Sequence, residues 1–325
     1  MMPPEPASSA ETASGLVALT GAGGFVGGHI ARHLTAAGWR VRALQRQRPA
    51  PEGLIGLSSI SGSLDDRASL EALVDGADAV VHCAGLVAAR RRRDFFDTNV
   101  GGTRALVDVA AARPKPPKFV LVSSMAARLP TISAYAESKR AAERALADRA
   151  GDMAWAVLRP SAVYGPGDRA TLSLFRAFAR GFAPAPTVAG ARFSLIYVDD
   201  VATGVLALLR PNALVGEMFE IDDGHTQGYS WPQVAAVAES QLGRRVRRLP
   251  MHRGVTLLAA HVIEGLASAS GRAAVFAPDK VREMFHPDWV CRDRGLGRLT
   301  GWRPAVGIAE GFERTFDWYR AEGWL

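Results

Sequence analysis

Short apolar segments alternate with longer amphipathic segments along the first half of the chain. The apolar segments are typical of buried parallel strands, and the amphipathic segments carry apolar residues at helical spacing. We expect strands at residues 16–20, 40–44, 79–82, 119–122 and 155–158. We expect helices at residues 32–38, 70–75, 100–112 and 136–147. This alternation predicts an α/β fold, in which helices cover both faces of a doubly wound parallel sheet.

The regular alternation ends after the stretch RPSAVYGPGD, residues 159–168. The remainder mixes helical segments with connections rich in Gly and Pro, and it shows no internal repeat. We expect residues 167–192 and 211–325 to form a smaller, mostly helical substrate lobe above the carboxyl edge of the sheet, where open α/β folds bind ligands. Residues 15–166 are the expected main domain, joined by further strand and helix elements from about 193–210. Residues 1–14 are an expected disordered leader.

The composition narrows the class of protein. Hydrophobic residues make up 48% of the 325 residues, which suits a soluble globular protein with a large core. Cys83 and Cys291 are too few for a disulfide framework or a zinc cluster, and they favour a reducing compartment. No apolar run reaches the ~18 residues of a spanning helix, and the beginning of the chain lacks the apolar core of a signal peptide. We therefore expect a cytoplasmic protein.

The net charge of +7 favours anionic partners, such as nucleotide phosphates or an anionic membrane surface. The sequence contains no zinc-finger pattern, no aromatic-rich RNA-binding signature and no basic helix with base-reading residues. Nucleic acid is therefore not an expected partner, and the oligomeric state is left open.

The stretch TGAGGFVG follows the first expected strand and opens an amphipathic segment. Its glycines Gly21, Gly24 and Gly27 let the backbone come close to a ligand. Phe25 and Val26 fall at the start of the helix, where free amides and the positive helix end bind a pyrophosphate. A tight β–α turn without a ligand would explain the glycines as well. Between a strand and a helix, however, the pattern favours a dinucleotide-binding Rossmann domain.

Further motifs follow in the order and spacing of one superfamily. They are HCAG (82–85), TNVGGT (98–103), VSSMAA (122–127), YAESK (135–139), LRPSAVYGPGD (158–168) and FSLIYVDDVA (193–202). Together with TGAGGFVG, they resemble the extended short-chain dehydrogenase/reductases, an NAD-dependent epimerase/dehydratase-like superfamily, over roughly residues 15–205. The resemblance implies an NAD(P)-dependent oxidoreductase without a bound metal.

The resemblance also implies contacts to the cofactor beyond the glycine stretch. The positions that it adds are Ser63, Leu64, Ala84, Gly85, Asn99, Pro160 and Val163. Ser63 departs from the family pattern, because it stands where the family has an aspartate near the adenine. Asn99 either supports the lysine of YAESK through water or begins a helix.

Tyr135 and Lys139 of YAESK lie four residues apart, on one face of a helix. An ammonium close to a phenol stabilises the phenolate, so we expect the pKa of Tyr135 to fall from ~10 and the phenol to work as a general acid/base near neutrality. In the family, the lysine also holds the nicotinamide ribose. A surface Tyr–Lys pair on a solvated helix is the alternative explanation.

The resemblance assigns the hydrogen bond to the substrate carbonyl to a serine after the fifth strand. Ser124 matches that position, and Ser123 is expected to be structural. Only ten residues separate Ser124 from Tyr135, whereas extended members usually have about twenty or more. The wall that faces the substrate is therefore reduced.

The end of the second expected strand bears on the choice of nicotinamide cofactor. NAD-specific folds place an Asp or Glu there to hold the ribose hydroxyls. Gln45 occupies that position, and Arg46 and Arg48 follow. A guanidinium suits a 2′-phosphate, so we expect NADP(H), with NAD(H) as the alternative if the arginines only solvate a loop.

Two apolar stripes and an arginine cluster mark the expected substrate lobe. The first stripe comprises Phe175, Phe178 and Phe182. The second comprises Val255, Leu258, Ala259, Val262 and Leu266, and it follows arginines at positions 244, 245, 247, 248 and 253. We expect the stripes to line a channel for an acyl chain, with the arginines at its mouth against an anionic bilayer. Core-facing helices beside a solvated basic loop would give the same pattern. The arginines at 90–93 are expected to form a solvated loop.

These features predict an NADP(H)-dependent reductase of a ketone on a long-chain lipid. The chain resembles the atypical bacterial branch of the superfamily that includes ceramide reductase and is related to an accessory subunit of respiratory complex I. This resemblance implies a substrate of the 3-oxo-ceramide or 3-oxo-sphingoid type. A nucleotide-sugar epimerase or dehydratase is the first alternative, although Ala162 replaces the asparagine that such enzymes usually carry in RxxNVYGP. A non-catalytic, nucleotide-binding subunit of a larger assembly is the second.

Overall fold

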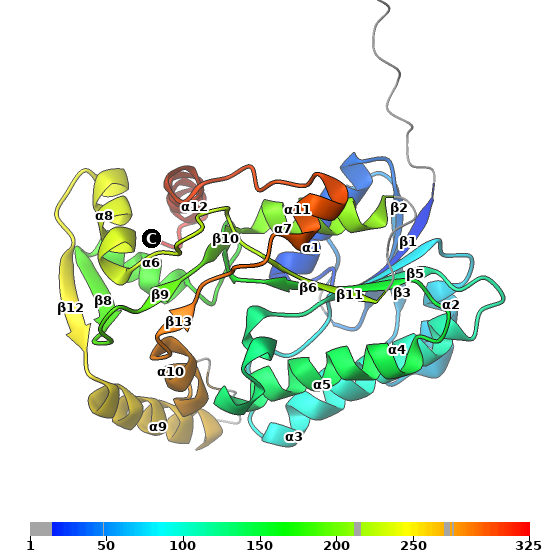
Figure 1. The fold of residues 1–325 in the computed structure, drawn as a ribbon, viewed down its shortest axis with the longest axis horizontal. Helices are drawn as coiled ribbons and strands as arrows, with labels where there is room; N and C mark the ends of the chain where they lie inside the picture. The colour runs from blue at the N-terminus through cyan, green and yellow to red at the C-terminus, as the bar shows by residue number, and fades with distance from the viewer. Residues whose placement is uncertain (1–14, 48, 211–215, 270–273, 275) are drawn as a thin grey trace, which may run out of the picture.

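The computed structural model describes residues 15–47, 49–210, 216–269, 274 and 276–325 (Figure 1). The expected leader and Arg48 lie outside these residues. Seven parallel strands form the main sheet, in the order β11-β6-β5-β4-β1-β2-β3. Their bounds are β1 Leu16–Thr20, β2 Arg40–Gln45, β3 Leu57–Ser61, β4 Ala79–His82, β5 Lys118–Val122, β6 Trp155–Pro160 and β11 Glu217–Ile221.

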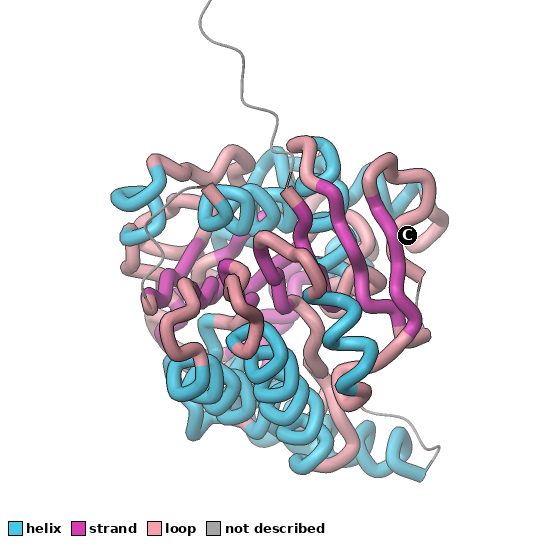
Figure 2. Tube along the Cα trace, turned by 90° about the vertical axis from the view of Figure 1, so that its right-hand side faces the viewer, coloured by secondary structure: helices cyan, strands magenta, loops and turns pink. Residues whose placement is uncertain are grey.

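Helices cover both faces of this sheet (Figures 1 and 2). On one face lie α1 (Phe25–Ala36) and α7 (Val198–Leu209). On the other face lie α2 (Arg67–Val74), α4 (Gly102–Ala111) and α5 (Ala134–Arg149). The apolar sides of the helices and the strands between them are almost completely buried, which explains why the strands are continuous apolar runs. The predicted Rossmann-type doubly wound sheet is confirmed.

Two strands of the sheet were not predicted. β3 lies at one edge and most of its residues are exposed or half-buried, so it has no apolar run that marks a strand. β11 pairs with β6 at the other edge. It comes from the region 211–325 that the sequence placed in the substrate lobe, so that boundary is corrected: the chain returns from the lobe to complete the main sheet.

Two helical boundaries also differ from the prediction. α1 begins at Phe25, inside the glycine stretch that was expected to open a helix, so the apolar segment at 32–38 marks only its end. The expected helix at 100–112 is preceded by a π-helical turn, η1 (Phe96–Gly101), which places Asn99 inside a helical segment and not at a helix start. Both differences concern the residues that follow a strand at its carboxyl end.

The smaller lobe lies at the left in Figure 1. Its short parallel strand pairs are β7 (Ala162–Tyr164) with β10 (Leu195–Tyr197), β8 (Phe182–Pro186) with β12 (Arg247–Met251), and β9 (Arg192–Phe193) with β13 (Asp288–Trp289). Its helices are α6 (Leu172–Ala179), α8 (Trp231–Leu242), α9 (Arg253–Ala269), α10 (Pro278–Met284) and α12 (Ile308–Ala321). α11 (Gly295–Thr300) packs instead on α7 and β11, where Leu296 joins the core of the main sheet.

An aromatic cluster forms the core of this lobe. Phe175 lies with its ring centroid 5.0 Å from those of Phe312 and Phe316, and Phe178 packs against the same group. Phe175 and Phe178 are each only 1% exposed, whereas Phe182 begins β8 and is 42% exposed. The expectation that these three residues line an acyl channel is therefore wrong for Phe175 and Phe178. Core-facing residues of a helix have the same spacing as channel-facing ones, so the pattern could not separate the two.

The second predicted stripe lies on the outer face of α9. Val255, Leu258, Val262 and Leu266 are between 55% and 70% exposed, so they line no enclosed channel. The opposite face of α9 packs on α10, where Ala260 belongs to one apolar cluster with Val281 and Phe285. Among the described residues, no helix is both long and apolar enough to cross a membrane.

The arginine run at positions 90–93 is exposed and leads into α3 (Arg92–Phe95). The Arg92 guanidinium lies 4.5 Å from the centroid of the Phe96 ring, and its Nη2 donates to Glu137 at 2.5 Å. The run is a solvated segment, as expected.

The two phenylalanine environments predict different costs of truncation. Phe175→Ala should lower the free energy of unfolding by about 3–5 kcal/mol, because it leaves a cavity in the aromatic cluster. Phe182→Ala, the matched control at an exposed position, should cost less than about 1 kcal/mol. Chemical denaturation measures both values, and equally small costs would contradict the assignment of Phe175 to the core.

Candidate active site

Two of the three glycines in the turn after β1 are required because a side chain there would collide with the protein's own backbone. Gly21 has φ +83°, and an added Cβ there would lie 2.7 Å from the amide nitrogen of Ala84. A Cβ at Gly27 would lie 2.0 Å from the carbonyl oxygen of Gly21. Gly24 is exposed and caps α1 without a side-chain hydrogen bond, so the amides of its first turn face outward. This uncapped, positive helix end fits a pyrophosphate.

A buried hydrogen-bond chain ties this turn to β4 and α4. The amide of Ala84 donates to Thr20 Oγ1, which lies 2.7 Å from His82 Nδ1, and His82 Nε2 lies 3.0 Å from Thr103 Oγ1. Thr103 Oγ1 itself donates to the carbonyl of Asn99 at 2.6 Å, so it must accept from Nε2–H, and Nδ1 accepts from Thr20. Burial, with the nearby charge of Lys139, lowers the pKa of His82 to about 3. The imidazole is therefore a neutral structural bridge beneath the turn.

The end of β2 presents Gln45 and Arg46 beside the segment that follows β3. The carbonyl of Gln45 accepts from the amide of Gly62 at 3.0 Å, and the side chain of Arg46 is exposed. Ser63 donates a hydrogen bond to Asp65, which holds the pKa of that carboxyl below its usual range, and the charge of Arg46 acts in the same direction. Asp65 was not predicted, and it adds a carboxylate to the region where a ribose or a 2′-phosphate would lie.

Asn99 fixes the segment after β4. Its Oδ1 accepts from the amide of Leu86 at 2.7 Å, and its Nδ2 donates to the carbonyl of Leu86 and to Ser138 Oγ. A Cβ added to Gly85 would lie 3.0 Å from Asn99 Oδ1 and 4.0 Å from Lys139 Nζ. Asn99 thus holds Ala84 and Gly85 against α5, close to the lysine.

The structure brings Ser124, Tyr135 and Lys139 together at the carboxyl end of β5. Ser124 follows β5, its Oγ accepts from the amide of Ala126 at 3.2 Å, and its hydroxyl lowers the pKa of the Tyr135 phenol. Lys139 is buried one turn further along α5, and its Nζ donates to the carbonyl of Val122 at 2.8 Å. Ser123 points the other way and donates to Glu143 at 2.6 Å, in agreement with its expected structural role.

The electrostatics of Tyr135 differ from the expectation. Burial raises its pKa to about 12, and Glu283 and the thiol of Cys83 act in the same direction, whereas Ser124 lowers it. Burial also lowers the pKa of Lys139. Lys139 is not among the groups that act on the phenol, so the expected fall of the pKa does not occur and the phenol keeps its proton at neutral pH.

Two functional neighbours of Tyr135 were missed by the sequence reasoning. Asp279 Oδ2 accepts from the amide of Ala134 at 2.9 Å, and Glu283 Oε1 accepts from Ser133 Oγ at 2.5 Å. Both carboxylates come from α10 of the smaller lobe, about 150 residues along the chain from the helix that they meet. No local motif connects the two regions.

The predicted site residues meet at one edge because all seven strands are parallel. Ser63 and Leu64 follow β3, Ala84 and Gly85 follow β4, and Pro160 ends β6. Val163 lies in β7, directly beyond this edge, where it is half-buried. The residues present therefore fit a dinucleotide across the carboxyl edge of the sheet.

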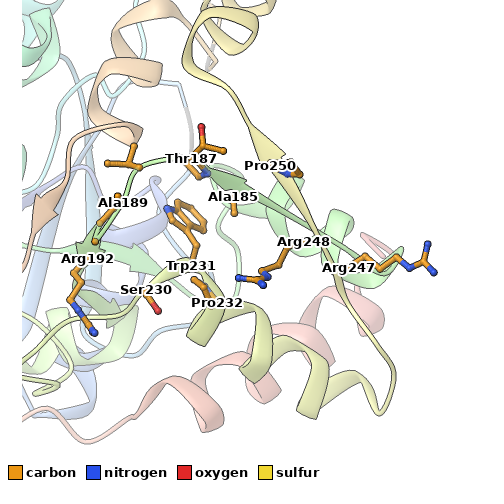
Figure 3. A pocket seen from close by; sticks show the side chains of 14 residues that line it. Ala185, Thr187, Ala189, Arg192, Ser230, Trp231, Pro232, Arg247, Arg248 and Pro250 are labelled. Carbon is orange, nitrogen blue, oxygen red and sulfur yellow. The ribbon is translucent and has the colours of Figure 1, made fainter.

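A separate groove of about 880 Å³ lies in the smaller lobe (Figure 3). It is bounded by the connection from β8 to β9, the start of α8 and β12, with Trp231 and Val188 on its apolar side and Arg248 beside them. Arg247 and Arg248, which were expected at the mouth of an acyl channel, line it, but none of its residues is a predicted catalytic or cofactor-binding residue.

Comparisons with known proteins agree with this geometry. The model of the NAD dependent epimerase/dehydratase family matches residues 17–222. Ceramide reductase of Caulobacter vibrioides is 36% identical over 97% of this chain and 98% of its own. A 4-hydroxy-2-methyl-3-oxo-4-farnesyl-3,4-dihydroquinoline-1-oxide ketoreductase of Stigmatella aurantiaca is 28% identical over 88% of this chain and 96% of its own.

Solved structures show the same fold at lower identity. The structure of MoeE5 in complex with UDP-glucuronic acid and NAD has a TM-score of 0.73 and 21% identity, and covers 95% of this chain and 100% of its own. The family model, the long alignment to a reductase and the architecture agree. The chain therefore belongs to the NAD-dependent epimerase/dehydratase family of extended short-chain dehydrogenase/reductases and is an NAD(P)-dependent oxidoreductase.

Proposed function

We propose that this protein reduces a ketone on a long-chain lipid, of the 3-oxo-ceramide or 3-oxo-sphingoid type, in sphingolipid biosynthesis. The observation that carries the proposal is the 36% identity, over nearly the whole chain, to an enzyme named ceramide reductase. The name of the Stigmatella relative likewise specifies a ketoreductase, acting on a compound with a farnesyl chain. The likeness to nucleotide-sugar enzymes concerns the fold alone, at 21% identity.

The bound nicotinamide cofactor would supply the hydride, and the chain's own residues would bind and protonate the substrate. Ser124 donates a hydrogen bond to the carbonyl oxygen and orients it. Tyr135, in the first turn of α5, would deliver the proton to the same oxygen. Lys139, buried one turn further along α5, would hold the nicotinamide ribose. The raised pKa of Tyr135 suits reduction, because the phenol carries the required proton at neutral pH.

Turnover with 3-oxo lipids of increasing chain length tests this function. Each methylene that the protein buries contributes about 0.8 kcal/mol, so kcat/KM should rise steeply with chain length.

Tyr135→Phe should fold and bind cofactor normally but lose on the order of 10²–10⁴ in turnover. NADPH oxidation, thermal unfolding and calorimetry measure these properties. A flat profile with a bound UDP- or dTDP-sugar would instead support a nucleotide-sugar enzyme, and wild-type protein that binds cofactor without any turnover would support a non-catalytic subunit.

We propose NADP(H) as the preferred cofactor. Gln45 stands at the end of β2 in place of an acidic residue, and the exposed guanidinium of Arg46 is free to meet a 2′-phosphate. Phe25 and Val26 would present the first amides of α1 to the pyrophosphate. NAD(H) remains the alternative.

Arg46→Ala should weaken NADPH binding at least about tenfold and leave NADH binding nearly unchanged, because only NADPH carries the 2′-phosphate. Arg40→Ala is the matched control, since Arg40 is exposed at the opposite end of the same strand. Calorimetry with both cofactors measures the difference. Tighter binding of NADH by the unmodified protein would overturn the NADP(H) proposal.

We also propose that the protein works in the cytoplasm and contacts an anionic inner membrane face through α9. Its outer stripe of four apolar residues is exposed over 55–70% of each side chain, which is unusual for a surface bounded by water. Arg247, Arg248 and Arg253 are exposed at the start of the helix and beside it, where they can meet lipid phosphates. The two free cysteines fit a reducing compartment.

The protein should bind vesicles that contain phosphatidylglycerol and release them as salt rises, because arginine–phosphate attraction is screened. Replacing Leu258 and Leu266 together by Asp should reduce this binding at least about tenfold. Ile55→Asp is the control, because Ile55 is 96% exposed but precedes β3, far along the chain from α9. Flotation measures the bound fraction, and equal binding by all three proteins would exclude α9 as the contact.

A further inference from the structure

The helix that carries Tyr135 begins against α10 of the smaller lobe. Ser133 caps α5 by accepting from the amide of Ala136 at 3.0 Å. The same hydroxyl donates to Glu283 Oε1, and Asp279 accepts from the amide of Ala134. Two carboxylates of α10 thus meet the positive end of α5, at the two residues that directly precede Tyr135.

Glu283 is held firmly at this contact. It is only 8% exposed, its Oε2 lies 2.9 Å from Lys280 Nζ, and its carbonyl accepts from Trp289 Nε1 at 2.8 Å. On the far side of α10, Val281 packs into the apolar cluster with Ala260 of α9. A carboxylate in this position has little freedom to turn away from α5.

The charge of Glu283 acts on Tyr135 directly. The groups that act on the phenol are Glu283 from α10, Cys83 after β4 and Ser124 after β5, and Lys139 lies one turn further on α5. Lys280 faces Glu283 from its own helix. A negative charge beside a buried phenol disfavours the phenolate, so Glu283 adds to the effect of burial on the pKa of Tyr135.

We propose that Glu283 is a positioning residue for the reaction, which fixes the first turn of α5 through Ser133 and keeps Tyr135 in its proton-donating form. The proposal rests on the proposed function only in giving Tyr135 the role of proton donor. Glu283 thereby makes α10 of the substrate lobe part of the environment of the Tyr135 phenol. Its charge favours reduction over alcohol oxidation at neutral pH, because oxidation needs the phenolate.

Glu283→Gln separates charge from geometry, since the amide oxygen still accepts from Ser133. The pKa of Tyr135 should fall by at least ~0.5 unit, because a like charge is removed from the phenolate. The alkaline limb of the reduction profile should move to lower pH by the same amount, and alcohol oxidation at neutral pH should become faster. Asp279→Asn is the matched control: it alters the same helix contact, but Asp279 is not among the groups that act on the phenol. Asp279→Asn should leave both the alkaline limb of the reduction profile and the rate of alcohol oxidation unchanged.

The phenol can be titrated without any substrate by NMR of tyrosine labelled at the ζ carbon, with Tyr135→Phe to assign the signal. This readout distinguishes failure of the inference from failure of the proposed function, which would appear as absent turnover with 3-oxo lipids. Thermal unfolding and cofactor binding confirm that each variant is folded. Glu283→Ala, which removes both charge and acceptor, serves as a second variant if Gln is not tolerated, and it should shift the titration in the same direction. An unchanged or raised pKa of Tyr135 in the folded variants would overturn the proposal.

Discussion

The position of α5 depends on a buried ion pair between Glu143 of α5 and Arg159 of β6. Arg159 Nε and Nη2 donate to the two carboxylate oxygens at 2.8 and 2.6 Å, and Ser123 adds a third hydrogen bond. Glu143 is only 2% exposed, so loss of Arg159 would leave a buried charge with only the partly exposed Arg140 as its ion partner, which costs up to about 3–5 kcal/mol. This contact lies one turn beyond Lys139 and fixes α5 against the carboxyl ends of β5 and β6. The meeting of Ser124, Tyr135 and Lys139 follows from it.

The other end of α5 is held by the smaller lobe, through Ser133 and α10. The helix with the tyrosine and the lysine is therefore anchored at one point by the main sheet and at another by the substrate lobe. A shift of α10 would change both the direction of the first turn and the charge beside the phenol. The geometry and the acidity of the site are consequently properties of both lobes, although every residue of the predicted triad belongs to the main domain.

The sequence could predict the residues that chain order alone brings together. In a parallel sheet each strand ends at the same edge, so residues after β1, β4 and β5 meet whatever the loops between them do. The sequence did not predict two strands of the sheet: β3, which lacks an apolar run, and β11, which returns from a distant part of the chain. Glu283 was missed for the same reason, because only the docking of the lobe brings it to Ser133. The acidity of Tyr135 was also misjudged, since spacing reports the distance to Lys139 but not the burial of the phenol.

The two apolar stripes show how far periodicity can be taken. Phe175 and Phe178 repeat as core residues do and lie in the core, whereas Val255 and Leu258 repeat in the same way and lie on the surface. What distinguishes α9 is that its opposite face is apolar too and is already occupied by α10. A helix that is apolar on two faces and packs with only one leaves the other for a non-aqueous partner. In this protein the packed face leads through α10 to Glu283 and Ser133, so α10 alone links the proposed membrane contact on α9 to the helix that carries the proposed proton donor.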